Sequence, residues 1–490
     1  MLPIISRACF RMLEAIKPFL IARPMQFTHT SPYHGADLPL RLRRSSPTQH
    51  LFARLSSWLT LLYATLTLAL FLSVADQALG HAKQLPLNAT LLCLVLLAPF
   101  TLSGLINRDR ARSEPDLIGL IAANTWVLGA FLILVLIALI SASSTTAYWG
   151  EGGKWIAIIP YGFAVMCSGL ALGLNQVVVR ALPIICCLSL ALLVGSIWYD
   201  TLHPGTFADA RNRAAGFPGN ANFAALVSVI VCAVGLDFSQ RRRNMSNPAR
   251  HAIDKVGSSA TMNLLLLLLT FAIVTMTMSR GGLVNFFALL AVFTAYRYLF
   301  SPISTRRKVL EIIALTLCVI AAVGFVVIYS ELSSQQNNNS RLSRLLSNQR
   351  VDDGSAGTRL AAVMDCVEHI ERSPLVGYGT GYARTMNELP HNIYLQQWVN
   401  NGLFGLVAYL ALLLTALITF HKRGYRNGVA LIVVVGIGGL FSHNLLDQRP
   451  FLILFGTLLA DSTVAQLTGG TSMSLLQLRT APKQRAAHQS

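Results

Sequence analysis

The chain is built from apolar runs of about twenty residues that alternate with shorter polar segments. The hydrocarbon core of a bilayer is about 30 Å thick and takes roughly 20 residues of α-helix to cross. A backbone in lipid must satisfy its own hydrogen bonds, and these runs are too long for the strands of a membrane barrel. The pattern therefore predicts an all-α polytopic membrane protein with about 12 transmembrane helices.

The expected spans begin and end where polar or charged residues interrupt the apolar runs. They lie at about 57–79, 88–105, 117–140, 155–173, 178–198, 222–238, 262–279, 282–300, 309–330, 392–420, 429–442 and 451–467. The spans divide the chain into a basic tail at 1–56, transmembrane helices at 57–330, a large loop at 331–391, further transmembrane helices at 392–467 and a second tail at 468–490.

Composition supports a membrane location and sets the expected orientation. Of the 490 residues, 53% are hydrophobic and only 12% are charged, whereas soluble proteins carry about 25% charged residues. The net charge is +18, and most Lys and Arg fall in the tails and in the loops on the same side as the tails. Because positive flanks stay in the cytoplasm, both termini are expected there. Membrane lipids, and not nucleic acid, are the partners that this charge predicts.

Two segments on the outer side are much longer than a turn, at 199–221 and 331–391. The second begins with polar residues, and apolar residues at helical spacing over 358–371 then predict an amphipathic helix. Such a helix either lies on the bilayer or caps a cavity. Ser373-Pro374 is expected to end it, and the glycines of 377–381 allow a sharp turn before His391. The sequence thus predicts a large loop on the outer side of the membrane that contains amphipathic helices.

Three segments place unusual polar groups at this outer side. They are Arg211 to Asn222, Ser279-Arg280-Gly281, and His391-Asn392-Ile393-Tyr394. Each has a purely structural alternative, which is helix capping for the asparagines, snorkelling for the arginines and anchoring of a helix for His391. Their location on one face of the membrane favours a shared site.

Arg280 stands in a very short link between two apolar runs, so its charge lies close to the membrane, where ionisable residues are usually functional. The first N–H groups of the following helix also attract anions. Together with Arg213 or Arg211 from the other loop, Arg280 is predicted to hold a diphosphate and to stabilise it as a leaving group. A metal ion is the alternative, but no outer Asp-x-Asp motif accompanies the arginines, and Asp209 alone is weak. No metal and no cofactor are therefore expected.

His391 is the candidate general base, because the ordinary pKa of histidine lies near neutrality. Its task would be to take the proton from an acceptor hydroxyl that attacks an anomeric carbon, and a single displacement predicts inversion at that carbon. Asn392 or a nearby carbonyl group is a candidate for orienting the imidazole. A histidine that only orients the acceptor remains the rival interpretation.

Four elements of the chain resemble the O-antigen ligase family and the wider group that includes O-antigen polymerases and protein O-oligosaccharyltransferases. These elements are Arg213 to Asn222, Ser279-Arg280-Gly281, Arg359 to Gly379, and His391 to Leu395 followed by Gly402 to Gly405. Ala221 and Met364 depart from the family pattern, which commonly has a proline and an aromatic residue there.

The resemblance implies a GT-C-like fold and metal-independent transfer of polysaccharide from undecaprenyl diphosphate. It implies diphosphate binding by Arg213 and Arg280 and acceptor activation by His391. Supporting roles are expected for Arg211, Asn222, Ser279, Gly281, Arg359, Asn392 and Tyr394.

The leading interpretation is an O-antigen ligase of the bacterial inner membrane, with lipid A-core as the acceptor and the active site facing the periplasm. A polymerase or a protein O-oligosaccharyltransferase would use the same residues. A secondary transporter is the alternative from a different class, since about 12 spans suit one. Transporters place ionisable groups near mid-membrane, whereas the expected span interiors here are almost free of charge, which favours an enzyme.

Overall fold

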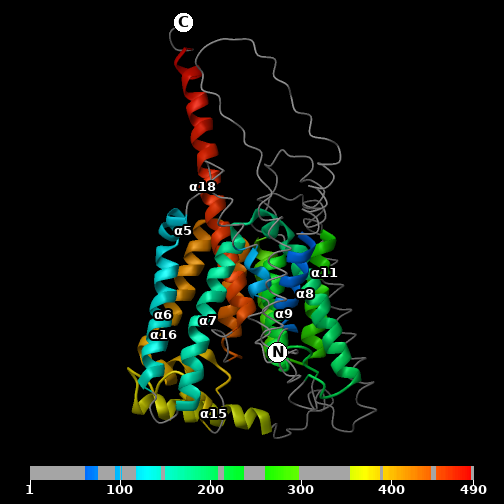
Figure 1. Cartoon of the computed structure of the whole chain (residues 1–490), viewed down its shortest axis with the longest axis vertical. Coiled ribbons are helices and arrows are strands. Elements are labelled where there is room, and N and C mark those ends of the chain that lie inside the picture. The colour runs from blue at the N-terminus through cyan, green and yellow to red at the C-terminus, as the bar shows by residue number, and fades with distance from the viewer. Residues whose placement is uncertain are drawn as a thin grey trace, which may run out of the picture. The chain divides into compact units, whose positions relative to one another are not determined.

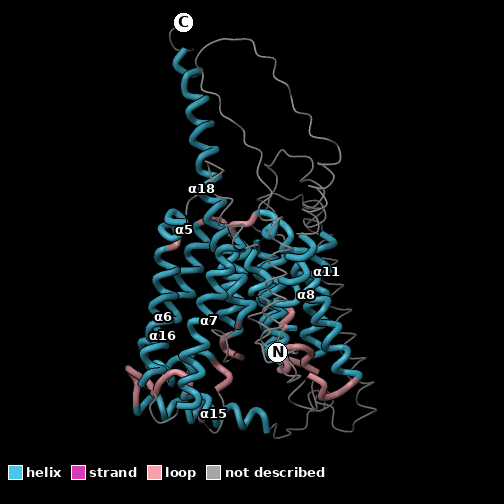
Figure 2. The backbone as a smooth tube through the Cα atoms, viewed as in Figure 1, coloured by secondary structure: helices cyan, strands magenta, loops and turns pink. Residues whose placement is uncertain are grey.

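The computed structural model describes residues 61–75, 94–99, 101, 117–144, 149–207, 214–236, 260–296, 354–386, 390–442 and 448–486. Within these ranges the chain forms helices, turns and bends, and none of the described residues lies in a strand (Figure 2). This confirms the all-α fold class. Four helices in the same ranges are long and apolar enough to cross a membrane: Thr125–Ala142, Gln176–Leu202, Ile393–Lys422 and Arg449–Leu467.

The helices follow the apolar runs closely (Figure 1). After an apolar helix at Leu61–Leu72, they are α5 (Leu117–Ala123), α6 (Thr125–Ser144), α7 (Trp149–Gly173), α8 (Gln176–Leu202), α9 (Ala221–Gly235), α11 (Ala260–Met276), α12 (Arg280–Thr294), α15 (Gly354–Arg372), the 3-10 turn η5 (Tyr382–Arg384), α16 (Ile393–Lys422), α17 (Arg426–Gly438) and α18 (Arg449–Ala486). The helix α18 continues well past the span that was expected to end at 467. The span expected at 309–330 lies outside the described residues, as do residues 331–353 and 387–389 of the large loop, so the total of about 12 spans stays a prediction.

One expected span, 117–140, is divided into α5 and α6 at Asn124. The Asn124 side chain is buried, donates to Leu120 O and Thr463 Oγ1 at 2.8 Å each, and accepts from Arg423 Nη1 at 2.9 Å. Arg423 follows α16 and also donates to Ser462 Oγ on α18 at 2.8 Å. The break therefore joins three helices through polar contacts, which the apolar pattern alone does not predict.

The helices α7 and α18 pack backbone against backbone. A Cβ atom at Gly169 would lie 2.2 Å from Ile453 O, and one at Gly456 would lie 2.3 Å from Met166 O. Neither position has room for a side chain. Small residues at membrane helix contacts allow this close approach, so α18 is held along much of α7.

The helix α16 is interrupted at Gly402, where φ is 64° and ψ is −166°. A Cβ atom there would lie 2.0 Å from Leu375 O, and Leu403 N donates to Pro374 O at 2.9 Å. The expected span 392–420 is thus two helical segments, 393–401 and 403–422. The second has about 20 residues, which at 1.5 Å per residue covers the full hydrocarbon thickness by itself.

The predicted amphipathic helix is confirmed as α15, which lies across the ends of α6, α7 and α16 (Figure 1). Its packed face carries Ala362, Cys366 and Ile370, whereas Leu360 and Met364 are exposed. Burial, with a smaller contribution from the charge of Asp365, raises the pKa of the Cys366 thiol to about 11. This cysteine is therefore a packing residue and not a reactive thiol.

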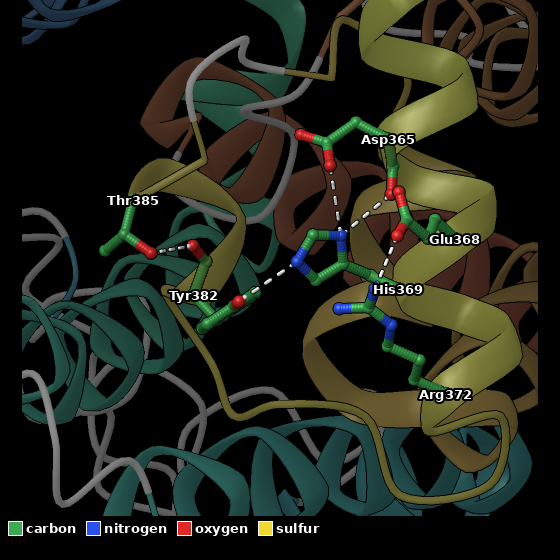
Figure 3. A network of polar contacts seen from close by, with 6 residues as sticks. All are labelled: Asp365, Glu368, His369, Arg372, Tyr382 and Thr385. Atoms are coloured by element: carbon green, nitrogen blue, oxygen red, sulfur yellow. Dashed lines mark hydrogen bonds and ion pairs between the residues drawn. The ribbon is translucent and has the colours of Figure 1, made fainter.

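A polar network attaches α15 to η5 (Figure 3). The imidazole of His369 lies with Nδ1 2.8 Å from Asp365 O and with Nε2 3.1 Å from the hydroxyl of Tyr382. The ring of Tyr382 stacks on Tyr378 with centroids 4.6 Å apart. These contacts fix the turn that leads from α15 toward the start of α16.

Candidate active site

The loop that precedes α9 is organised by one buried carboxylate on α8. Asp200 is only 1% exposed and accepts hydrogen bonds from the backbone N–H groups of Phe207 (3.1 Å), Ala215 (2.8 Å) and Gly216 (3.3 Å). A buried carboxylate needs such donors, and three of them offset much of its desolvation. Asp200 therefore joins both ends of the segment that contains Arg211 and Arg213.

Replacing Asp200 by alanine is expected to lower the free energy of unfolding by roughly 1.5–3 kcal/mol, because buried backbone N–H groups lose a charged acceptor. Thermal unfolding of the purified protein in detergent measures this loss. Glu368→Ala is the matched control, since that carboxylate is exposed and its pair with Arg372 contributes about 1 kcal/mol at most. Equal losses in the two variants would show that Asp200 does not organise the loop.

Of the two asparagines expected to cap α9, Asn220 and Asn222, the structure uses Asn220, whose Oδ1 accepts from Asn222 N at 3.0 Å and Phe223 N at 3.2 Å. Asn222, the other candidate for this cap, instead accepts from Ser279 Oγ at 3.0 Å. That bond links the first predicted segment to the second. Two of the three segments singled out from the sequence therefore meet.

The link between α11 and α12 is short and conformationally constrained. Met278 has a φ of 48°, a left-handed backbone conformation that non-glycine residues rarely adopt. Ser279 then caps α12 by accepting from Gly282 N at 3.1 Å. Arg280 is the first residue of α12 and its side chain is exposed. The arginine thus stands at the helix N-terminus, where the N–H groups and the helix dipole also favour an anion.

The third segment begins α16. His391 is half-buried, and Asn392 caps the helix by accepting from Tyr394 N at 2.9 Å and Leu395 N at 3.2 Å. The Oδ1 atom of Asn392 is therefore committed to the cap. The hydroxyl of Tyr394 donates to Gly436 O on α17.

The end of α17 connects this third segment to the other two. Ile393 N donates to Gly439 O at 2.8 Å. A Cβ atom at Gly438 would lie 2.6 Å from Leu226 Cδ1 of α9 and 2.7 Å from Asn285 Nδ2 of α12. The backbone of α17 thus approaches α9, α12 and α16 at one place.

A partly open cavity lies at this meeting point, with a volume of about 330 Å³ that includes space open to the surroundings. It is lined by Asn222, Leu226, Ser279, Gly281, Gly282, Asn285, Gly438, Phe441 and Ser442. The side chain of Asn285 is 1% exposed, and its Oδ1 has no hydrogen-bond partner in the described part of the protein. We call this space the Ser279 cavity. Its glycines and helix N-terminus suit a small polar ligand that approaches the backbone closely.

Sequence reasoning missed Asp200, Asn285 and the glycines of 436–439. The spacing Gly436-x-Gly438-Gly439 at the end of an apolar run was a usable signal, because glycines inside a membrane helix often mark a close approach. Asn285 carried a signal too, as an amide inside an apolar run. Asp200 carried a weaker signal, since acidic residues are common at the ends of membrane spans.

Several predicted residues are not placed by the structure. Arg211 and Arg213 lie in 208–213, outside the described residues, so the clamp of two arginines stays a prediction. Arg359 belongs to α15, but its side chain is outside the description. Among the described residues no group of three His, Cys, Asp or Glu side chains is close enough to hold a metal ion; the metal-independent chemistry also stays a prediction.

The described helices and the polar site at their ends define this chain as a helical membrane protein. Its candidate site lies at one end of the helix bundle. Residues 265–410 match the family model described as O-antigen ligase, which confirms the resemblance to that family. The matched stretch contains Ser279, Arg280 and His391, and the family indicates glycosyl transfer of the O-antigen ligase or polymerase type. No curated protein matches the chain.

Proposed function

We propose that this protein is an O-antigen ligase, which transfers polysaccharide from undecaprenyl diphosphate to lipid A-core at the periplasmic face of the bacterial inner membrane. The observation that carries the proposal is the convergence of the Ser279–Gly281 turn and the start of α16 at the end of α17, inside the stretch that matches the family.

The proposed chemistry gives each predicted site residue one task. The acceptor hydroxyl oxygen attacks the anomeric carbon of the donor sugar, and its proton passes to the imidazole of His391. The bond between that carbon and the diphosphate oxygen breaks, and undecaprenyl diphosphate leaves with the electron pair. Arg280, with Arg213 from the neighbouring loop, stabilises the charge on the leaving diphosphate. One displacement inverts the configuration of the anomeric carbon.

The experiment that tests the acceptor uses purified protein with undecaprenyl-diphosphate-linked glycan, with and without lipid A-core, and separates the products by size. A product that forms only with lipid A-core supports a ligase. Longer donor-linked chains in its absence would show a polymerase instead. Transfer to neither acceptor would turn attention to protein acceptors, and uptake of a solute into vesicles would identify a transporter.

Chelation of divalent ions is expected to leave the transfer rate unchanged, because arginines and a helix N-terminus neutralise the leaving group in this mechanism. The measurement is the transfer rate before and after treatment with EDTA. A loss of activity that added Mg²⁺ or Mn²⁺ restores would contradict the metal-independent reaction and would assign part of the leaving-group stabilisation to an ion.

A further inference from the structure

The first segment of α16 presents a row of amide side chains to the membrane helices. Gln396, Gln397, Asn400 and Asn401 are each no more than 6% exposed. At 3.6 residues per turn they fall with Ile393 on one side of the segment. Together with Thr380 and apolar residues of α6 (131–138) and α7 (158–163), they line a partly open pocket of about 610 Å³, a volume that includes space open to the surroundings. We call it the amide cavity.

The amide cavity changes from polar to apolar along α6. Its polar end lies beside the last turns of α6, where Thr380 Oγ1 lies 2.8 Å from Ala138 O and Ser141 Oγ donates to Asn400 O at 3.1 Å. Phe131 lines the other end of the cavity. It precedes Ala138 by seven residues, which places it about 10 Å from Ala138 along the helix axis. The cavity therefore matches a molecule with an apolar chain and a polar linkage at one end.

Part of the amide row is used to hold the protein together. Asn401 Nδ2 donates to Gln397 Oε1 at 2.8 Å, and Asn401 Oδ1 lies 2.7 Å from Thr380 Oγ1. Gln396 differs, because its buried Oε1 has no hydrogen-bond partner among the described residues. A buried carbonyl oxygen without a donor is unfavourable, so this position favours a ligand that supplies an N–H or O–H group.

Charge decides between the two lipids of the proposed reaction. All the residues that line the amide cavity are uncharged. A diphosphate would lose its hydration there without gaining a cation, whereas Arg280 and the N-terminus of α12 stand beside the Ser279 cavity. Acyl chains joined through amide groups, or carrying hydroxyl groups, supply an N–H or O–H group that can donate to Gln396 Oε1.

We propose that the amide cavity binds an acyl chain of an acylated glycolipid, with an amide N–H or hydroxyl group of that lipid donating to Gln396 Oε1. The inference rests on the proposed function. It assigns the acceptor lipid to the amide cavity and the lipid diphosphate to the side of the Ser279 cavity, with the His391 end of α16 between them. Gln396 then contributes to specificity for the acceptor and takes no part in bond breaking.

Binding without turnover tests the assignment. Native mass spectrometry of the full-length protein in detergent measures affinity for two probes, a tetra-acylated glucosamine disaccharide with amide-linked hydroxyacyl chains and undecaprenyl diphosphate. Gln396→Leu keeps the side-chain volume and is expected to weaken glycolipid binding roughly three- to tenfold, as the loss of one hydrogen bond predicts. Ala138→Phe fills the cavity and is expected to weaken it by at least roughly tenfold. Neither change should alter the affinity for undecaprenyl diphosphate.

Leu136→Phe is the control for Ala138→Phe, because Leu136 lies on the same helix with its side chain 47% exposed, away from the cavity. It should bind both lipids as the unaltered protein does. Three results for Gln396→Leu and Ala138→Phe would overturn the proposal: weaker binding of undecaprenyl diphosphate alone, equally weakened binding of both probes, or unchanged binding of both. If the unaltered protein binds the glycolipid through Gln396 but transfers nothing to lipid A-core, the cavity assignment stands and the proposed function fails.

Discussion

Replacing His391 by alanine is expected to lower the rate of glycan transfer roughly 10²- to 10⁴-fold, the range that a positioned acid–base group contributes. The imidazole stands directly before the cap of α16, and the cap is made by Asn392 and not by the histidine. The substitution should therefore leave the helix intact. Because the diphosphate is proposed to contact the arginines, donor binding should remain close to that of the unaltered protein.

The measurement is the transfer rate of purified protein beside donor affinity in the same detergent. His421→Ala is the matched control, since His421 is an exposed histidine at the opposite end of the same helix and is expected to be dispensable. Loss of donor binding in His391→Ala would refute the acceptor-activating role, because it would place the imidazole on the donor lipid.

Replacing Arg280 by lysine is expected to lower the transfer rate roughly 10²-fold, similar to the loss of one donor that stabilises a transition-state charge. Lysine keeps the charge but presents a single ammonium group, whereas the guanidinium offers a planar fork that matches phosphate oxygens. The capping bonds of Ser279 do not involve the Arg280 side chain, so α12 should still begin at the same residue.

Transfer kinetics at varied donor concentration measure this effect, with Arg372→Lys as the control. Arg372 is exposed at the end of α15, where it pairs with Glu368, and lysine should serve equally well there. Full activity of Arg280→Lys would contradict bidentate recognition of the diphosphate. A rise in KM alone, with kcat unchanged, would indicate that Arg280 binds the donor without stabilising the leaving group.

The elements of the fold were predictable because length and apolar content dictate a membrane helix directly. The cap at Asn220 and the amphipathic α15 were predictable for the same reason, since both depend on residues adjacent in the sequence. The breaks at Asn124 and Gly402 were not, because each depends on partners far along the chain.

The candidate site shows the same division. Arg280 and His391 stood out as ionisable residues at the ends of apolar runs, which is a local signal. The way in which their segments meet was largely hidden, because the spacing of Gly436, Gly438 and Gly439 indicates a close approach but does not identify the helices that make it. The amide cavity was equally hidden, since the break at Gly402 separates the segment that carries Gln396 from the remainder of α16.

The proposed reaction is a single displacement at the anomeric carbon, activated by His391, with a lipid diphosphate as the leaving group. The configuration of the new glycosidic bond, determined by NMR on the product of purified protein and compared with the donor, tests this most directly. The mechanism predicts inversion. Retention would contradict it, because two displacements through a glycosyl-enzyme intermediate would then be needed and His391 would no longer suffice as the base.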